Sequence, residues 1–438
     1  MRPKNRSWIK LGLQLPLICI VLPVIFGSGL VGAQEAKTRV AVLVAAQDVF
    51  TLNASGLFEH FGMQRLMRED KFELVDSEQI IGNTELPAQS GEFKAAISEL
   101  NKGLINYENL ELVKAIGELA CAIDLFEKVP AEVERDSLRN YVTALTYLGA
   151  SLILKGELQQ GQDSFSRLVV YDRRAQLDES IFPPAMIRTF ETVRKHVISG
   201  PLGSLSLFSN PSHGRVYIDG VFRGITPCTV DNLPVGKHLV VVRKMGFETW
   251  GGTARIEKDS QREERCRLLD LPGGEGLIRD ISRFASQMQA GVRLSKELQT
   301  VLEAARVDQV ALGGLVQRGK QVSAQFGIFD VKTGNPVNWH LGTVNTGSPD
   351  VAKVIDKFFS DLITSRSNML QFKDPIAEGG GQLRLKDEDR FKEEEPTPII
   401  ERWYFWTGIG VGAATLATLL AVFLPRGSEP ESQILIEF

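Results

Sequence analysis

The sequence contains few of the residues that build metal sites. Its 438 residues include only 4 cysteines and 5 histidines. No two histidines have His-x-x-x-His spacing, none has a carboxylate at a recognised pairing distance in sequence, and no cysteine pair has C-x-x-C spacing. We therefore expect no metal ligands. The histidines are His60, His196, His213, His238 and His340.

Motifs of the common enzyme classes are also missing. The chain has no G-x-S-x-G nucleophile elbow, no Walker loop and no dinucleotide fingerprint. The glycine run at residues 379–381 has neither a lysine nor a helix start beside it, so it does not resemble a phosphate-binding loop. The acidic residues are scattered over helical segments, where a solvated surface is the usual explanation. The sequence thus predicts no catalytic residues, no cofactor and no enzyme activity.

An excess of basic residues is missing as well. The net charge is −4. Nucleic acids and anionic lipids are bound by basic surfaces, so the sequence does not predict either as a partner.

The amino-terminal end resembles an export signal. Basic residues between Arg2 and Lys10 precede an apolar run over residues 11–30, and Val31-Gly32-Ala33 offers the short side chains of a cleavage site. We expect a signal peptide over residues 1–33 that is cleaved before Gln34. The alternative is an uncleaved anchor, because the apolar run is long for a signal peptide.

A second apolar run, residues 403–424, contains no charged side chain. Its roughly 22 residues would span about 33 Å as a helix, which exceeds the ~30 Å of a hydrocarbon core. Trp403, Tyr404 and Trp406 form an aromatic collar at one end, as in membrane spans. We expect a flexible charged linker over residues 367–402, a transmembrane helix over 403–424 and a short tail over 425–438. The glycines at 408, 410 and 412 would also permit self-association through this helix.

Cys19 is removed if the signal is cleaved, which leaves three cysteines in the mature chain. Cys228 and Cys266 fall in the same predicted β-domain. They either pair in an oxidising compartment or remain two small buried thiols.

Residues 34–85 and 276–366 each contain part of an α/β pattern. Residues 40–44 form a short, continuously apolar strand, typical of a strand buried on both faces. A helix and a second strand at 72–75 follow it. The later segment predicts helices at 277–288 and 294–306, strands near 310–312, 322–329 and 337–344, and a last helix after Ser348. Neither part has enough sheet to be stable alone, so we expect one split domain.

Residues 91–199 show apolar residues at helical spacing throughout. Gly149 and Phe165 are placed like the small and large residues of facing helices, and the region resembles a pair of tetratricopeptide-like repeats with a closing helix. Such repeats either form a groove for a protein partner or brace their neighbours as a plain helical bundle.

Residues 203–269 carry the most specific motifs. Val216-Tyr217-Ile218 precedes Asp219-Gly220, a strong hairpin signal. Gly224-Ile225-Thr226-Pro227, then Leu233-Pro234-Val235-Gly236-Lys237-His238, then Gly246-Phe247 follow in order. This series resembles the PEGA domain, a small β-sandwich of bacterial and archaeal surface proteins. The resemblance implies envelope structures and protein contacts, and no catalytic residues.

The turn that gives the PEGA family its name departs from the pattern. It reads Pro211-Ser212-His213-Gly214, which is longer and carries a histidine. The fold expectation is unaffected, but any ligand carried by this turn is in doubt.

The split α/β domain resembles the amino-terminal domain of TolB and related envelope proteins. The matching segments are residues 40–44, 72–76, 310–316 and 328–334, mostly as hydrophobic pattern plus an Asp-x-x-Thr-Gly turn. In this arrangement the helical and PEGA-like regions are an insertion between two halves of one sheet. Val42 should then lie in one sheet with residues 310–312 or 322–329.

The sequence therefore predicts a multidomain α+β protein of the bacterial cell membrane, with one transmembrane pass and most of the chain in the periplasm. The expected function is a membrane-tethered scaffold or assembly factor that binds other envelope proteins without catalysis. The alternative is a transmembrane sensor that binds a ligand outside the cell membrane. The short tail after Arg426 counts against a sensor, because it can hold no cytoplasmic output domain.

Overall fold

The computed structural model describes residues 37–82, 89–136, 138–288 and 292–364. The predicted signal peptide, linker, transmembrane helix and tail (1–33, 367–402, 403–424 and 425–438) lie outside these residues. Across the described ranges, no helix is both long and apolar enough to cross a membrane. The described residues mix helices with three sheets, which agrees with the α+β class.

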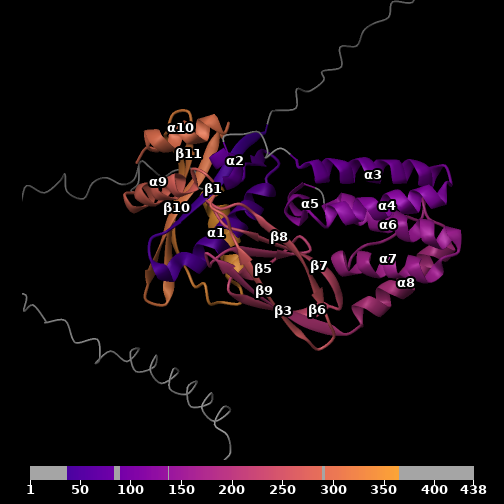
Figure 1. Ribbon diagram of the computed structural model, residues 1–438. Coiled ribbons are helices and arrows are strands. Elements are labelled where there is room, and N and C mark those ends of the chain that lie inside the picture. Colours follow the sequence, from indigo (N-terminus) through magenta and orange to yellow (C-terminus); the bar gives the residue numbers. More distant parts are fainter. Residues whose placement is uncertain (1–36, 83–88, 137, 289–291, 365–438) are drawn as a thin grey trace, which may run out of the picture. The chain divides into compact units, whose positions relative to one another are not determined.

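One five-stranded sheet is built from two distant parts of the chain (Figure 1). Its strand order is β12-β11-β10-β1-β2. β1 pairs in parallel with β10, and Val42 lies beside Ala311, so the predicted sharing of one sheet is confirmed. The likeness to TolB rests on sequence patterns alone and stays a prediction. The strands are β1 (Thr38–Ala46), β2 (Phe72–Leu74), β10 (Gln309–Arg318), β11 (Gln321–Asp330) and β12 (Pro336–Val344).

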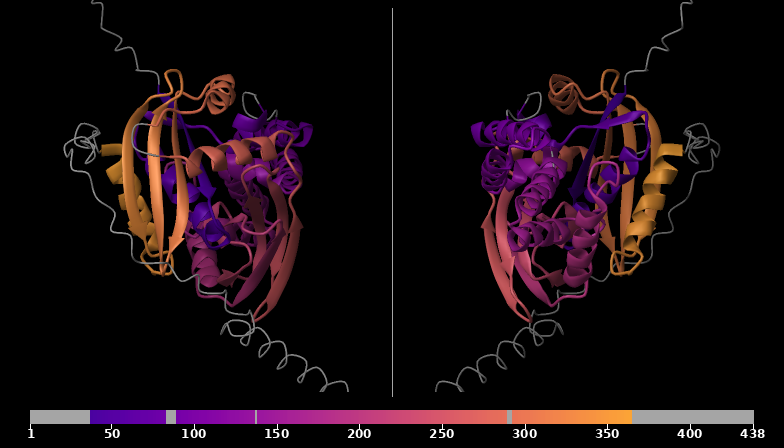
Figure 2. Two further views of the ribbon diagram at one scale, coloured as in Figure 1. Left: turned by 90° about the vertical axis from the view of Figure 1, so that its left-hand side faces the viewer. Right: turned by 90° about the vertical axis from the view of Figure 1, so that its right-hand side faces the viewer.

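The central position of β1 explains its unbroken apolar sequence. Ala41, Leu43 and Ala45 belong to one hydrophobic core, whereas Val40, Val42 and Val44 belong to another. α9 (Gly274–Ser286) and α10 (Lys296–Ala304) contribute to the first core. α1 (Leu52–Met67) and α11 (Val351–Thr364) contribute to the second, where α11 lies along the sheet (Figure 2). Alternate side chains of a strand point to opposite faces, so both faces of β1 must be apolar. Two short helices complete this part, η1 (Val49–Thr51) and α2 (Ser77–Gly82).

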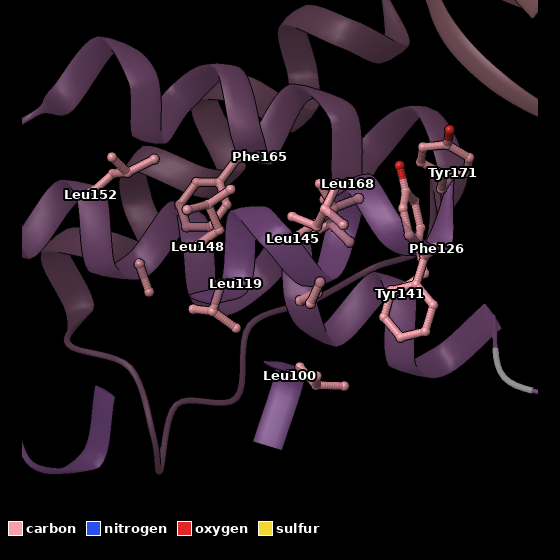
Figure 3. Close-up of a cluster of buried hydrophobic side chains, with 14 of the residues drawn as sticks. Leu100, Leu119, Phe126, Tyr141, Leu145, Leu148, Leu152, Phe165, Leu168 and Tyr171 are labelled. Carbon is pink, nitrogen blue, oxygen red and sulfur yellow. The ribbon is translucent and has the colours of Figure 1, made fainter. Parts of the chain in front are cut away.

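The predicted helical region consists of α3 (Gly91–Glu108), α4 (Leu112–Phe126), α5 (Pro130–Asp136), α6 (Leu138–Lys155), α7 (Leu158–Tyr171) and α8 (Pro184–Ile198). Leucines and aromatic side chains from α3, α4, α6 and α7 share one core (Figure 3). α6 and α7 approach closely at Gly149, where a Cβ atom would lie 2.6 Å from the Phe165 ring. The small and large residues noted in the sequence therefore face each other. Pro130 begins α5, where its missing N–H is harmless.

Residues 202–268 form two facing sheets with one core between them. The strand orders are β6-β3-β9 and β5-β4-β7-β8. Leu205 and Leu207 of one sheet share a core with Val216, Val240 and Val242 of the other. The strands are β3 (Leu202–Asn210), β4 (Arg215–Ile218), β5 (Val221–Ile225), β6 (Cys228–Pro234), β7 (Gly236–Arg243), β8 (Trp250–Ile256) and β9 (Gln261–Arg267).

Two local expectations in this β-sandwich can be compared with the structure. Asp219 and Gly220 both have positive φ, +52° and +72°, so the predicted tight hairpin between β4 and β5 is confirmed. Residues 233–238 were predicted to form a tight connection before a strand at 239–242. The connection is tight but shorter than predicted, because β6 continues through Pro234 and β7 begins at Gly236, so that only Val235 lies between them.

Candidate functional site

The β-sandwich contacts both other parts of the described chain. Figure 1 shows its strands between the five-stranded sheet and helices α3–α8. On the α1 side, Arg215 of β4 forms an ion pair with Glu59 of α1. Arg215 is 2% exposed and Glu59 is 6% exposed, so this pair is enclosed. Burial raises the pKa of the Glu59 carboxyl, and the charge of Arg215 opposes that rise.

An aromatic cluster lies beside this ion pair. The His60 ring stacks on Phe222 with 3.9 Å between centroids, and its Nδ1 lies 3.0 Å from the Tyr217 hydroxyl. Burial, assisted by the charge of Arg215, lowers the pKa of His60 to about 4. His60 is therefore neutral near pH 7. We call the contact made by Glu59, His60, Arg215, Tyr217 and Phe222 the closed joint.

Arg243 at the end of β7 joins three parts of the chain. Its Nη1 lies 3.1 Å from Asp76 Oδ2, and its Nη2 pairs with Glu134 of α5. Burial alone would raise the pKa of Asp76, but the charges of Arg243 and Arg215 outweigh burial and lower it. Arg243 thus holds the β-sandwich against both the segment after β2 and the helical region.

A cavity of about 270 Å³ lies next to the closed joint, at the carboxyl end of β1. Open α/β sheets commonly bind ligands outside the carboxyl ends of their parallel strands. Its apolar lining residues include Leu52, Met245, Ile278 and Ile281. Its polar lining residues include Glu59, His213, Arg215, Arg243 and Lys244, and we call these five the polar wall.

Lys244 is half-buried in this wall. Burial lowers the pKa of its amine; Glu59 opposes this and Arg215 adds to it. His213 has φ +67°, and its Nδ1 lies 2.8 Å from Ser212 Oγ. The departure from the family turn therefore places a histidine at a cavity.

A second hollow of about 670 Å³ lies between the helical region and the β-sandwich. Four exposed arginines line it, Arg139, Arg173, Arg174 and Arg223. Apolar side chains line the rest, including Leu138, Val142, Val170, Leu233 and Pro234. We call this hollow the arginine groove.

The two acidic residues that line the arginine groove, Asp172 and Asp219, already have partners close to them in the structure. Asp172 accepts a hydrogen bond of 2.9 Å from the backbone N–H of Arg174. Asp219 is buried and contacts His238. The arginine charges therefore dominate the groove surface.

Glu127 connects α4 to the β-sandwich on the same side. It lies 2.6 Å from Arg167 Nη2 and 2.5 Å from Lys237 Nζ. Burial would raise the pKa of Glu127, but hydrogen bonds from Lys237 and Tyr141, with the charge of Arg167, lower it. We call the contact of Glu127 with Arg167 and Lys237 the open joint, because both cationic side chains are more than a third exposed.

A buried histidine–carboxylate pair was not predicted from the sequence. His238 Nδ1 lies 2.6 Å from Asp219 Oδ2, its Nε2 contacts the Pro234 carbonyl oxygen at 2.8 Å, and Leu239 N–H donates to Asp219 Oδ1 at 3.0 Å. Both residues are interior, so their role is to fix the β4–β5 turn against β7. Asp219 and His238 belong to two separate motifs of the PEGA family. Their presence in these motifs was the feature of the sequence from which the pair could have been suggested.

The remaining histidines and cysteines do not form a metal site or a disulfide among the described residues. Within the described ranges, no group of three or more His, Cys, Asp or Glu side chains is arranged to hold a metal ion. Cys121, Cys228 and Cys266 are free thiols, so of the two alternatives for Cys228 and Cys266 the structure has separate thiols. Burial raises the pKa of Cys228 and of Cys266 to about 11, so both thiols stay protonated at neutral pH.

Comparison with protein families matches residues 202–268 to the PEGA domain. This segment is a PEGA domain. The range predicted from the sequence motifs, residues 203–269, begins and ends one residue later. No curated protein matches the chain. The likeness of the helices to tetratricopeptide repeats stays a prediction from sequence.

Proposed function

We propose that the protein is a non-enzymatic scaffold or assembly factor of the bacterial cell envelope. A single helix at residues 403–424 would hold it in the cell membrane, with the PEGA domain and its neighbours in the periplasm binding other envelope proteins. The arginine groove is the observation that carries this proposal. Its apolar lining and surrounding arginines suit an acidic segment of a partner protein.

The charges in the groove are available for such a contact. Among the described residues, no carboxylate lies within ion-pair distance of Arg139, Arg174 or Arg223. Arginine is enriched at protein interfaces, where its planar guanidinium pairs with carboxylates in two hydrogen bonds. A partner carrying Asp or Glu beside an apolar residue would use both features of the groove.

A second surface also supports protein binding. Ile105, Leu110 and Val113 surround the turn between α3 and α4 and are 57%, 71% and 70% exposed. Three large apolar side chains that gather on one turn are typical of a contact surface. This turn lies at the end of the helical hairpin.

Site-directed photo-crosslinking tests the proposal in living cells. A photoreactive residue at Arg174 should give one discrete crosslinked product in the envelope fraction, and Arg139→Glu with Arg223→Glu should abolish it. The control position is Lys258, an exposed residue on the turn between β8 and β9. Equal products from both positions, or a product that survives charge reversal, would contradict groove binding.

Reporter fusions test the location separately. A periplasm-active reporter fused after Ser367 should be active, and the same reporter fused after Phe438 should be inactive. The reverse pattern would place the PEGA domain in the cytoplasm and would contradict the proposal that its partners are periplasmic proteins of the envelope. The mature amino terminus should be Gln34, which sequencing of the purified protein would determine.

A transmembrane sensor remains the second candidate. The cavity beside the closed joint favours it, because a sensor needs a ligand site in its outer part. A sensor would also have to change its helix pairing in the membrane when the ligand binds. Crosslinking between the transmembrane helices of two copies, with and without ligand, separates a sensor from a static scaffold.

A further inference from the structure

We propose that the cavity at the carboxyl end of β1 binds a small organic anion. The oxyanion group of this ligand would contact the polar wall, and its short apolar body would contact the apolar lining residues. The proposal concerns a site separate from the arginine groove. Failure of either test therefore leaves the other proposal standing.

Two buried donors at the cavity have no acceptor. The Nε–H groups of Arg215 and Arg243 are buried, and neither donates a hydrogen bond to any described residue. Both residues line the cavity. Buried polar groups in native proteins almost always have a partner, which is either protein, ordered water or a bound ligand. The cavity is the space where an acceptor for these donors would lie.

The charges of the polar wall favour an anion. Arg215, Arg243 and Lys244 face a single lining carboxylate, Glu59. Glu59 pairs with the end of the Arg215 guanidinium, and Asp76 and Glu134 pair with the two terminal nitrogens of Arg243. These pairs leave the Nε edges of both guanidinium groups unused.

Lys244 adds a whole positive charge. Among the described residues, no carboxylate lies within ion-pair distance of its Nζ. A half-buried charge without a counter-ion is stabilised by an anion that reaches it, because water screens the two charges less there than at a fully exposed position. An oxyanion in the cavity would supply the counter-ion for Lys244 and acceptors for the two Nε–H groups.

The size of the cavity limits the ligand. Its volume of about 270 Å³ is close to the lower end of the ~300–1,000 Å³ range of ligand pockets. A peptide or a lipid chain is too large for it. The wall of Leu52, Met245, Ile278 and Ile281 favours a body of a few carbon atoms rather than an inorganic ion.

The walls are held in place by packing. A Cβ atom at Gly56 of α1 would lie 2.6 Å from Ile225 of β5, so the helix and the PEGA domain are in direct contact beside the cavity. The closed joint fixes the same two elements. A ligand therefore enters a preformed site, and little of its binding energy is used to order the protein.

Calorimetric titration and thermal unfolding of the detergent-solubilised full chain test the proposal. The probes are butyrate and butyl phosphate. 1-Butanol is the control that has the apolar body but no charge, and inorganic phosphate is the control that has the charge but no apolar body. We expect saturable binding of at least one organic anion, a rise of Tm of a few degrees, and no saturable effect of 1-butanol. The tighter of butyrate and butyl phosphate identifies the oxyanion group.

Two variants and one control locate the binding. Lys244→Met should weaken binding at least tenfold, whereas Lys237→Met changes a lysine outside the cavity and should leave it unchanged. Ser282→Leu narrows the cavity without changing its charge, so this variant should also abolish binding. It tests the same cavity if the Lys244→Met variant does not fold. The proposal is overturned if neither organic anion binds saturably, if 1-butanol binds as well, or if Lys244→Met and Lys237→Met bind alike.

Discussion

The PEGA domain meets α1 through a closed, buried contact and meets the helical region through an open, charged one. In the closed joint, the ion pair of Arg215 and Glu59 is almost fully buried and the His60 ring stacks on Phe222. In the open joint, Lys237 and Arg167 reach Glu127 from positions that are 37% and 38% exposed. Both contacts use opposite charges, so their difference lies in access to water.

Access to water decides what each contact does. A buried ion pair contributes little net stability, but it is very costly to break because the remaining charge is left without a partner or water. A half-exposed pair contributes only about 0–1 kcal/mol, since water and salt screen it. The closed joint therefore sets the geometry of the cavity, whereas the arginines beside the open joint remain available to a partner.

The largest expected effect comes from breaking the closed joint. Glu59→Ala leaves Arg215 as a buried charge without a carboxylate, and we expect a loss of roughly 3–5 kcal/mol of unfolding free energy. Urea denaturation followed by circular dichroism measures it. Replacing both partners, as Glu59→Met with Arg215→Met, should recover most of the loss, because neither charge then remains buried.

A matched surface pair is the control for that result. Glu263 and Arg265 also form an ion pair, but their side chains are 51% and 73% exposed. Glu263→Ala should change the unfolding free energy by no more than about 0.5 kcal/mol. If Glu59→Ala is equally mild, the closed joint is open to water and the comparison fails.

The next largest effect is expected at the turn that faces the helical region. Gly220 has φ +72°, and a Cβ atom there would lie 2.7 Å from Leu138 Cδ2. Gly220→Val should cost about 2 kcal/mol or more, because backbone strain and a steric contact add together. Gly319→Val is the matched control: Gly319 has φ +61° but no atom within 4 Å of the added Cβ, so it carries strain alone. Equal losses would mean that Leu138 moves freely and that this contact is loose.

Much of the fold could be predicted from apolar patterns. The unbroken run of β1 predicted a strand with neighbours on both sides, and the structure gives it β10 and β2. The Asp219-Gly220 dipeptide predicted a hairpin that the positive φ angles confirm. In both cases the local sequence determines the local structure, because few backbone conformations suit those residues.

The strands β8 and β9 were not predicted. β9 reads Gln-Arg-Glu-Glu-Arg-Cys-Arg, and of its side chains only Cys266 is buried. β9 lies at the edge of its sheet, so most of its side chains contact water and no apolar alternation marks it. β8 contains two adjacent glycines, Gly251 and Gly252, which weaken the strand pattern further.

The charged groups of the candidate site could not be predicted either. The acidic residues were interpreted as solvated surface, yet Glu59 and Asp219 are buried. Their partners, Arg215 of β4 and His238 of β7, are in other parts of the fold, and a single sequence does not reveal which distant residues pair. Only the folded chain brings Glu59 of α1 to Arg215 of β4 and thereby creates a cavity with cationic walls.

A smaller effect should follow from acidification of the closed joint. The pKa of His60 is lowered to about 4 in the folded protein, compared with about 6.5 in an unfolded chain. A lowered folded-state pKa gives stability that is complete above pH 6.5 and is lost as pH falls through 4. We expect a loss of about 1–2 kcal/mol between pH 7 and pH 4.5, after allowance for partial screening by water.

A His60→Asn variant isolates this contribution. Asn keeps a polar atom near Tyr217 but does not titrate, so the variant should lose less stability than the parent over the same pH interval. Urea midpoints at both pH values give the comparison. Parallel pH profiles for the two proteins would show that His60 is solvated when folded.

The smallest effect is expected in the open joint. Lys237→Met removes one of two cations from Glu127, and Arg167 remains at 2.6 Å. The carboxylate therefore keeps a partner, and we expect a loss below about 1 kcal/mol, which 0.5 M salt should reduce further. Removing Lys237 should also raise the pKa of Glu127 toward its ordinary value, so that the parent's advantage disappears as pH falls through the lowered pKa of this carboxyl. A loss as large as that of Glu59→Ala, independent of salt, would show that the helical region is fixed to the PEGA domain as firmly as α1 is. The arginine groove would then be a rigid wall, and a partner would have to fit it without any movement of the helices.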